Sequence, residues 1–351
     1  MAFIIIYKSA IVINMKDLFE KLLVLRTPKI GPARYNDLVA RFGSVVDAAQ
    51  SLGADGAHID MVRREMDAAA AMGIEYISDD DARYPVGLKA IKNHPPVISV
   101  RGNTSVLNSP AVSIVGTRHA TAAGMGFVSD MAKSFAGRGY VVVSGMAMGT
   151  DSAAHRGALQ TGATIAVLAG GADYIWPLEN ESLYYEIIER GCVISEMPVG
   201  YKPIATNFVQ RNRIVAGMGN MLILGEADMK SGSMTTARFA IEYGRPVYAI
   251  PSHPSDPRAS GPNSLIRSGD ARLCIGMEDF FESDDLIAAN KKNEKKFDSE
   301  NSLIDALGII PVSESVLAQL VKKSVSEIKS ELVVLELQGI VRKVDGGYVR
   351  A

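Results

Sequence analysis

The hydrophobic positions of this 351-residue chain change their spacing near residue 111, from a helical pattern to apolar runs that alternate with helices. Before that point, apolar side chains recur at helical spacing in Lys16–Leu25, Arg34–Phe42 and Ile59–Met72. Residues 15–75 are therefore predicted to form short helices. The turn Ile30-Gly31-Pro32 between two of them is compatible with a hairpin that contacts a DNA backbone, although a plain connector is the simpler interpretation.

The second pattern predicts a sheet. Six apolar runs are predicted to be strands, namely Ala111–Val115, Tyr140–Ser144, Thr164–Leu168, Cys192–Ser195, Met221–Leu224 and Pro246–Ile250. Helical patterns such as Gly124–Arg138 and Thr235–Tyr243 lie between them, and continuous apolar strands are typical of a sheet buried on both faces. The fold class is therefore α/β, with a doubly wound, mainly parallel sheet in residues 105–283. Residues 76–104 are expected to form a connector that leads into it.

A small separate module is predicted at the C-terminal end. Residues 284–300 are polar and charged, which indicates a linker. The elements expected after it are two helices and a hairpin: Ser315–Leu320, Ser326–Gln338, and Ile340–Lys343 paired with Gly347–Arg350. This order indicates a winged-helix module in residues 301–351.

The first 14 residues are apolar, but they are too short to span a bilayer and lack a basic segment of the kind that begins a signal peptide. We expect them to be an extension outside the fold, with Met15 as the physiological start. The alternative is an added edge strand. No membrane association is expected from this segment.

Composition limits the function classes. A chain with 47% hydrophobic and 22% charged residues is typical of a globular protein, and its length allows two or three domains. Because the net charge is −2, any nucleic-acid binding must come from a local basic patch and weaken steeply with salt. Cys192 and Cys274 lack metal-ligand spacing, so we expect a reduced cytoplasmic setting and no metal site.

Glycine and hydroxyl residues gather where the predicted strands end. Four segments share this character: Gly116-Thr117-Arg118, Ser144-Gly145 through Thr150, Ala169–Ala172, and Ser231-Gly232-Ser233. In a doubly wound sheet, ligands bind beyond the carboxyl ends of the strands. Glycines let backbone N–H groups approach phosphate closely, so these segments predict an anion-binding crevice.

A run of aromatic and basic residues adds to this prediction. Phe208 precedes Arg211-Asn212-Arg213, which combines a ring for a base with planar cations for phosphate. The alternative is that the arginines pair with acidic neighbours at the start of a helix. Residues two apart cannot face the same way in a helix, so we expect one arginine to grip phosphate and the other to stabilise the loop.

Other chemistries are disfavoured. The chain has no Gly-x-Gly-x-x-Gly segment after its first predicted sheet strand and no Gly-x-x-x-x-Gly-Lys-Ser/Thr loop, which argues against NAD and against nucleotide hydrolysis of the P-loop type. Asp151 and His155 are four apart and could form an acid–base pair. The simpler interpretation is that Asp151 caps a helix and His155 packs or hydrogen-bonds locally. We expect no cofactor and no catalysis.

Three segments together resemble the DprA/Smf family, the DNA-processing proteins of bacterial natural transformation. They are Ile114–Arg118, Ser144–His155 and Phe208–Arg213. The resemblance implies an extended Rossmann-like domain, preceded by a SAM-like helical domain at residues 15–75 and followed by a winged-helix domain. It also implies binding and protection of single-stranded DNA without catalysis, homodimerisation, and loading of the RecA recombinase. The DNA-binding set predicted from the resemblance and from the strand ends is Gly116, Thr117, Arg118, Ser144, Gly145, Lys202, Phe208, Arg211, Asn212, Arg213, Ser231 and Gly232.

Three positions depart from the family pattern. Met148 stands where arginine is usual, Val209 where proline is usual and Ser252 where glycine is usual. Two other functions stay open: a nucleotide-processing hydrolase of the lysine-decarboxylase-like family, and a winged-helix transcription regulator. The hydrolase pattern lacks its glutamate near Ser231, and the C-terminal module is less basic than a DNA-reading winged helix.

Overall fold

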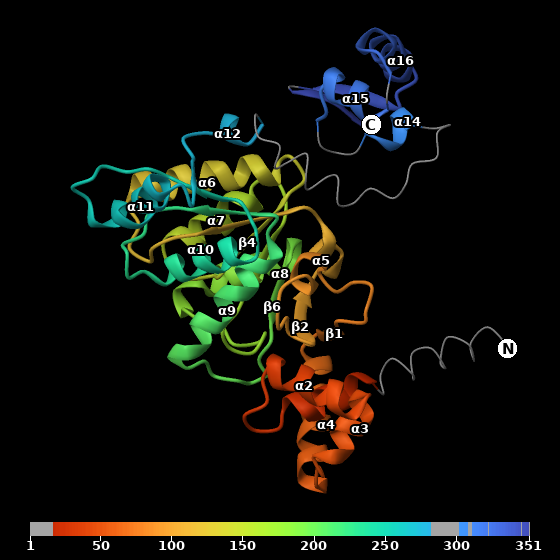
Figure 1. Ribbon diagram of the computed structural model, residues 1–351, viewed down its shortest axis with the longest axis vertical. Coiled ribbons are helices and arrows are strands. Elements are labelled where there is room, and N and C mark those ends of the chain that lie inside the picture. The colour runs from red at the N-terminus through yellow and green to blue at the C-terminus, as the bar shows by residue number, and fades with distance from the viewer. Residues whose placement is uncertain (1–16, 282–301, 308–310, 322, 345, 351) are drawn as a thin grey trace, which may run out of the picture.

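A computed structural model of the protein describes residues 17–281, 302–307, 311–321, 323–344 and 346–350 (Figure 1). The predicted extension at residues 1–14 and the predicted linker at residues 284–300 lie outside these ranges. Within them, no helix is both long enough and apolar enough to cross a membrane.

Four short helices form the N-terminal part, as the hydrophobic spacing predicts. Residues 17–25 are helical and are followed by α2 (Pro32–Phe42), α3 (Val45–Ser51) and α4 (Gly56–Ala71). Side chains fix where two of them begin, because Ser44 accepts the backbone N–H of Asp47 and Asp55 accepts that of His58. The sequence pattern missed α3, which is only seven residues long.

Buried charges join these helices to the sheet. Lys21 forms ion pairs with Asp79 and Asp80, immediately after the first strand of the sheet. Arg26 pairs with Glu65 of α4 at 2.6 Å, and the Tyr76 hydroxyl donates to the same carboxylate at 2.5 Å. Because Arg26 and Glu65 are both buried, each depends on the other to offset the cost of leaving water.

The sheet has nine strands in the order β1-β2-β6-β5-β4-β3-β7-β8-β9. Their bounds are Ile74–Ser78, Val97–Gly102, Ala111–Val115, Val141–Ser144, Thr164–Val167, Cys192–Ser195, Met221–Leu224, Val247–Ala249 and Arg272–Leu273, for β1 to β9 in turn. All pairings from β6 to β9 are parallel, so the predicted α/β class with a mainly parallel sheet is confirmed. The six predicted strands are β3 to β8.

The segment 76–104 corrects an expectation, because it belongs to the sheet instead of leading up to it. It contains most of β1 and all of β2, and β2 pairs antiparallel with β6, with Ser99 opposite Ser195. These strands are hard to recognise from sequence. The first begins only two residues after α4 ends, across the turn Met72-Gly73, and the second is a short apolar run directly behind Pro95 and Pro96.

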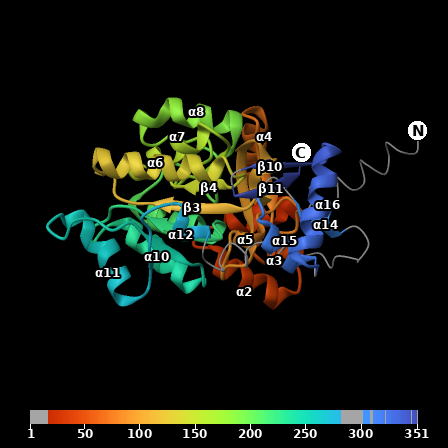
Figure 2. The same cartoon turned by 90° about the horizontal axis from the view of Figure 1, so that it is seen from above.

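Helices cover both faces of the sheet, as Figure 2 shows for β3 and β4. One face packs against α6 (Ala122–Ala136) and α7 (Thr150–Leu159), with α8 (Glu181–Arg190) beside them. The other face packs against α9 (Ala205–Met218) and α10 (Gly232–Glu242). Alternate strand residues serve opposite faces, so that Ile114 faces α6 while Val115 faces α9 and α10.

Short elements complete the sheet domain. They are α5 (Val86–Lys89), α11 (Ser260–Ser268), α12 (Glu278–Phe281) and the 3₁₀ turns Thr104–Asn108, Leu178–Asn180 and Pro257–Ala259.

The C-terminal module has the helix and hairpin order of a winged helix, as predicted. It consists of α14 (Ser302–Asp305), α15 (Glu314–Leu320), α16 (Val325–Leu337) and the antiparallel hairpin of β10 (Val341–Val344) and β11 (Gly347–Arg350). A capping box of Ser324 and Glu327 starts α16. Leu317, Ile328, Leu332 and Tyr348 share a core of the module's own.

Candidate nucleic-acid interface

Three strand-end segments interlock at the carboxyl edge of the sheet. The Thr117 N–H after β3 donates to the carbonyl oxygen of Glu226 after β7 at 2.6 Å. The backbone N–H and the hydroxyl of Thr150, where α7 begins, both donate to the Thr117 carbonyl oxygen at 3.2 Å. The Glu226 carboxylate in turn accepts the N–H and hydroxyl of Thr121 at 2.7 and 2.5 Å. The segments after β3, β4 and β7 are therefore held in one arrangement.

Two glycines make this close approach possible. A Cβ on Gly116 would lie 2.4 Å from the Thr150 hydroxyl oxygen, and one on Gly149 would lie 2.5 Å from the Thr117 carbonyl oxygen. Gly149 also has a φ of +74°, which side chains disfavour. The glycine-rich composition of these segments thus has a packing cause.

A cavity of about 350 Å³ opens beside the interlocked segments. Nine of the twelve residues predicted from sequence line it: Gly116, Thr117, Arg118, Gly145, Phe208, Arg211, Asn212, Ser231 and Gly232. They come from the ends of β3 and β4, from α9, and from the start of α10. Residues far apart in the sequence therefore meet at one place, at the edge where a doubly wound sheet binds ligands.

Arg211 is the buried charge of this cavity. Its side chain projects from α9 to the ends of β4 and β5, where Nη1 donates to the carbonyl oxygens of Gly145 and Val167. A Cβ on Gly145 would lie 2.3 Å from this nitrogen, so glycine is needed there. Burial lowers the pKa of Arg211 to about 10, which still leaves it charged at neutral pH.

Asp151 and His155 are both buried, and the Arg211 charge influences the pKa of each. Asp151 accepts the Ala147 N–H at 3.3 Å, and burial raises its pKa while the Arg211 charge opposes that rise. The prediction from sequence that Asp151 caps α7 is wrong, because Gly149 is the N-cap and no side chain caps this helix. His155 Nδ1 lies 2.7 Å from the Thr164 hydroxyl, which confirms the local role predicted for it.

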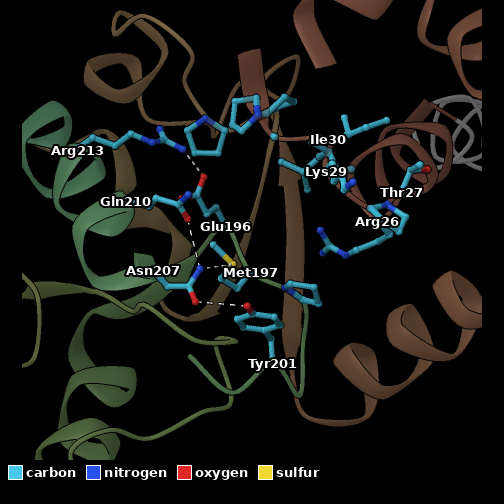
Figure 3. A pocket seen from close by; sticks show the side chains of 18 residues that line it. Arg26, Thr27, Lys29, Ile30, Glu196, Met197, Tyr201, Asn207, Gln210 and Arg213 are labelled. Carbon is cyan, nitrogen blue, oxygen red and sulfur yellow. Dashed lines mark hydrogen bonds and ion pairs between the residues drawn. The ribbon is translucent and has the colours of Figure 1, made fainter. Parts of the chain in front are cut away.

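Arg213 faces away from the cavity. It pairs with the buried Glu196 carboxylate (Figure 3). It also donates to the Asn93 carbonyl oxygen at 3.1 Å. The alternative given from the sequence, that an arginine of this run pairs with an acidic residue, therefore applies to Arg213. Of the other two predicted residues outside the cavity lining, Ser144 is buried and donates to the Ile114 carbonyl oxygen at 2.6 Å, whereas Lys202 is exposed.

Arg118 is the exposed cation at the cavity, and two aromatic rings accompany it. Its guanidinium carbon lies 4.9 Å from the ring centroid of Trp176 and 5.6 Å from that of Phe208. The two rings contact each other edge to face, with centroids 4.6 Å apart. Trp176 was missed from sequence because it lies in the loop between β5 and α8, outside every motif. The available signal was that it is the chain's one tryptophan.

The start of α10 completes the cavity. Ser231 caps this helix through the Ser233 N–H, and Asn212 of α9 donates to the Gly232 carbonyl oxygen at 3.2 Å. A helix N-terminus offers unpaired N–H groups and a partial positive charge, both favourable to an anion. Of the positions that depart from the family pattern, Val209 lines the cavity and is 49% exposed, whereas Met148 is 43% exposed without lining it.

No group of three or more His, Cys, Asp or Glu side chains within the described ranges could hold a metal ion. The cavity is lined by cations, rings, hydroxyls and backbone N–H groups, together with the Asp151 carboxylate. This combination suits a phosphate-containing ligand that also carries flat rings.

Comparison with known proteins gives consistent matches. The family model for DNA recombination-mediator protein A matches residues 75–284, and the model for the DprA winged helix domain matches residues 288–347. Protein Smf of Escherichia coli is 34% identical over 287 residues, which is 78% of this chain and 76% of that protein. Protein Smf of Synechocystis is 35% identical over 243 residues, 68% of this chain, but the match spans only 55% of that longer protein.

Two solved structures are similar to this one. DNA processing protein A of Streptococcus pneumoniae is 31% identical with a TM-score of 0.60, and the match covers 79% of this chain and 94% of that one. The Helicobacter pylori protein, whose structure concerns its binding of single-stranded DNA, is 30% identical with a TM-score of 0.55. That match covers 63% of this chain and 97% of the other.

Replacing Arg211 by methionine is expected to lower the free energy of unfolding by about 3–5 kcal/mol, because Asp151 would stay buried without its cation. Urea unfolding followed by circular dichroism measures this. The matched control is Arg118→Met, which removes an exposed guanidinium and should change stability by less than about 0.5 kcal/mol. Equal stability of the two variants would contradict the structural role of Arg211.

Acidification should destabilise the protein through His155. Burial and the Arg211 charge lower its pKa to about 3, whereas the unfolded chain takes up this proton near pH 6.5. Between these values the unfolded state binds more protons, so stability falls as the pH drops below about 6.5. In His155→Asn, the decline of the urea midpoint from pH 7 to pH 5 should be shallower, and equal slopes would refute this assignment.

Proposed function

Because the chain belongs to the DprA/Smf family of DNA-processing proteins, we propose that it binds single-stranded DNA, without catalysis, in the cavity at the carboxyl edge of its sheet. The observation that carries the proposal is the group of Arg118, Trp176 and Phe208 at that cavity. Proteins hold single strands through cations that follow the backbone and rings on which bases stack.

The rest of the cavity supplies contacts for phosphate. Arg118 is exposed and forms no ion pair with any described side chain, so its charge is available to a ligand. Arg211 adds a fixed positive charge below it, and the start of α10 adds backbone N–H groups. These contacts do not depend on base identity, so the binding we propose is tolerant of sequence.

Absence of catalysis is supported by the state of the best acid–base candidates. His155 is fully buried, and its low pKa leaves it neutral. Asp151 lines the cavity but is only 6% exposed, and its carboxylate accepts the Ala147 N–H at 3.3 Å. Because the histidine is inaccessible and the carboxylate is almost completely buried, this pair argues against the hydrolase alternative. Release of a base from a nucleoside monophosphate would revive that alternative.

The wider role we propose follows from family membership. The protein protects the bound strand, acts as a homodimer in the cytoplasm, and helps load the RecA recombinase during DNA uptake and recombination. Two cavities in one dimer would raise the avidity for a strand long enough to reach both.

Arg118→Ala should weaken the binding of single strands of any sequence by about tenfold, because both a phosphate contact and a cation over the rings are lost. The slope of log affinity against log salt should fall by about 0.7. Fluorescence anisotropy with labelled single- and double-stranded oligonucleotides, at two salt concentrations, measures both quantities. The matched control is Arg156→Ala, an exposed arginine outside the cavity lining. Absence of a preference for single strands in the unmodified protein would refute the proposed function.

The unmodified protein should have the mass of a dimer in light scattering and shorten the lag before RecA hydrolyses ATP on single-stranded DNA. Arg118→Ala should keep the dimer mass and shorten the lag less than the unmodified protein does, since it weakens DNA binding alone. A monomeric mass, or an unchanged lag with the unmodified protein, would refute this wider role while leaving strand binding as a separate question.

A further inference from the structure

Two sides of helix α9 each line a different hollow. Phe208, Arg211, Asn212 and Val215 face the DNA cavity, at the spacing of one side of a helix. Asn207, Gln210 and Arg213 line the other side, at intervals of three residues. Figure 3 shows these three side chains opposite Arg26, Thr27, Lys29 and Ile30 of the N-terminal helical part. Helix α9 therefore separates two hollows.

The second hollow, which we name the interdomain crevice, has a volume of about 590 Å³. It lies between the turn after the first helix, Pro95-Pro96, the segment after β6, and α9. A neighbouring hollow of about 420 Å³ shares Gly31, Pro32 and Arg213 with it and extends toward α10. Arg213 thus lies between two adjoining hollows.

Unpaired cations gather around these two spaces. Five basic residues line them against two acidic ones: Arg26, Lys29, Arg34, Lys92 and Arg213 against Glu196 and Glu242. Arg26 is neutralised by Glu65, and Arg213 by Glu196. The other three cations, Lys29, Arg34 and Lys92, are exposed and form no ion pair with any described residue. Their charges remain available for an anionic ligand.

The lining also suits bases. Prolines 28, 32, 95, 96 and 198 give flat apolar surfaces, and the Tyr201 ring adds an aromatic one. The Gln210 side chain is exposed and can donate and accept hydrogen bonds at a base edge. Proteins bind a flexible polynucleotide through cations that contact its phosphates and flat surfaces that contact its bases, and polar side chains can hydrogen-bond to the base edges.

We propose that the interdomain crevice and the neighbouring hollow together bind the nucleotides that flank the DNA cavity on the same single strand, with Lys29 of the crevice and Arg34 and Lys92 of the neighbouring hollow neutralising their phosphates. The proposal rests on the proposed function, since it extends that site. What favours a strand over an acidic peptide is continuity across α9. Val209 lines the DNA cavity and is 49% exposed, and its neighbour Gln210 is exposed and lines the crevice. A strand has to cross only one helix, about 10 Å wide.

The test uses the full chain and two oligothymidylates, one of about six nucleotides that occupies the DNA cavity and one of about twenty that also reaches the crevice. The triple variant Lys29→Gln, Arg34→Gln, Lys92→Gln removes the charges with little change of shape. It should bind the short strand with unchanged affinity and the long strand at least tenfold more weakly. For the long strand alone, the salt slope should fall by about 2, which is three phosphate contacts.

Controls separate this inference from the proposed function. Lys133→Gln removes an exposed lysine of α6, on the opposite face of the sheet, and should bind both strands normally. Arg118→Ala should weaken both lengths. Urea unfolding confirms that the triple variant is folded, and single variants replace it if it is not. Normal long-strand binding by the folded variants would overturn the inference and leave the DNA cavity standing, as would a weakening equal for both lengths. Failure of the unmodified protein to bind either strand would overturn both.

Discussion

The buried guanidinium of Arg211 is the interaction on which the carboxyl edge of the sheet depends. Its Nη1 donates hydrogen bonds to two carbonyl oxygens, at the ends of β4 and β5, and so connects these strands to α9. A charge so deeply buried is costly unless partners offset it, and the carbonyl dipoles and Asp151 do so here. Gly145 must lack a side chain for the same reason. Arg211 thus holds α9 against the strand ends, leaves no space for a side chain at Gly145, and places a positive charge in the cavity.

The three arginines at and beside the cavity have different roles, which follow from how deeply each one is buried. Arg211 is an internal cation whose position cannot vary, and it sets the electrostatic potential of the cavity floor. Arg118 is an external cation on a pair of rings, free to follow a mobile ligand. Arg213 has its charge offset by Glu196 and stabilises the far side of α9. A chain with a slightly acidic net charge can in this way present a local positive surface without a basic fold.

Much of the sheet, and the location of the site, could be predicted from the sequence because both follow from local patterns. Continuous apolar runs specify buried parallel strands, and glycine-rich strand ends specify where segments approach closely. The antiparallel strands β1 and β2 were not recognised, because β1 begins almost directly after α4 and β2 is a short apolar run directly behind two prolines. The roles of Arg211 and Arg213 depend on the rotation of α9 about its axis. Trp176 reaches the site through a loop, which no periodicity describes.

Trp176 has a practical consequence. The chain has one tryptophan, and its indole lies against Arg118 and Phe208 where the strand is proposed to arrive. Tryptophan emission responds to nearby charge and to stacking with bases, so an occupied cavity would change the only indole signal that the protein emits. Occupancy can then be followed without attaching a dye to either partner, and the same signal distinguishes events at the cavity from events elsewhere on the chain.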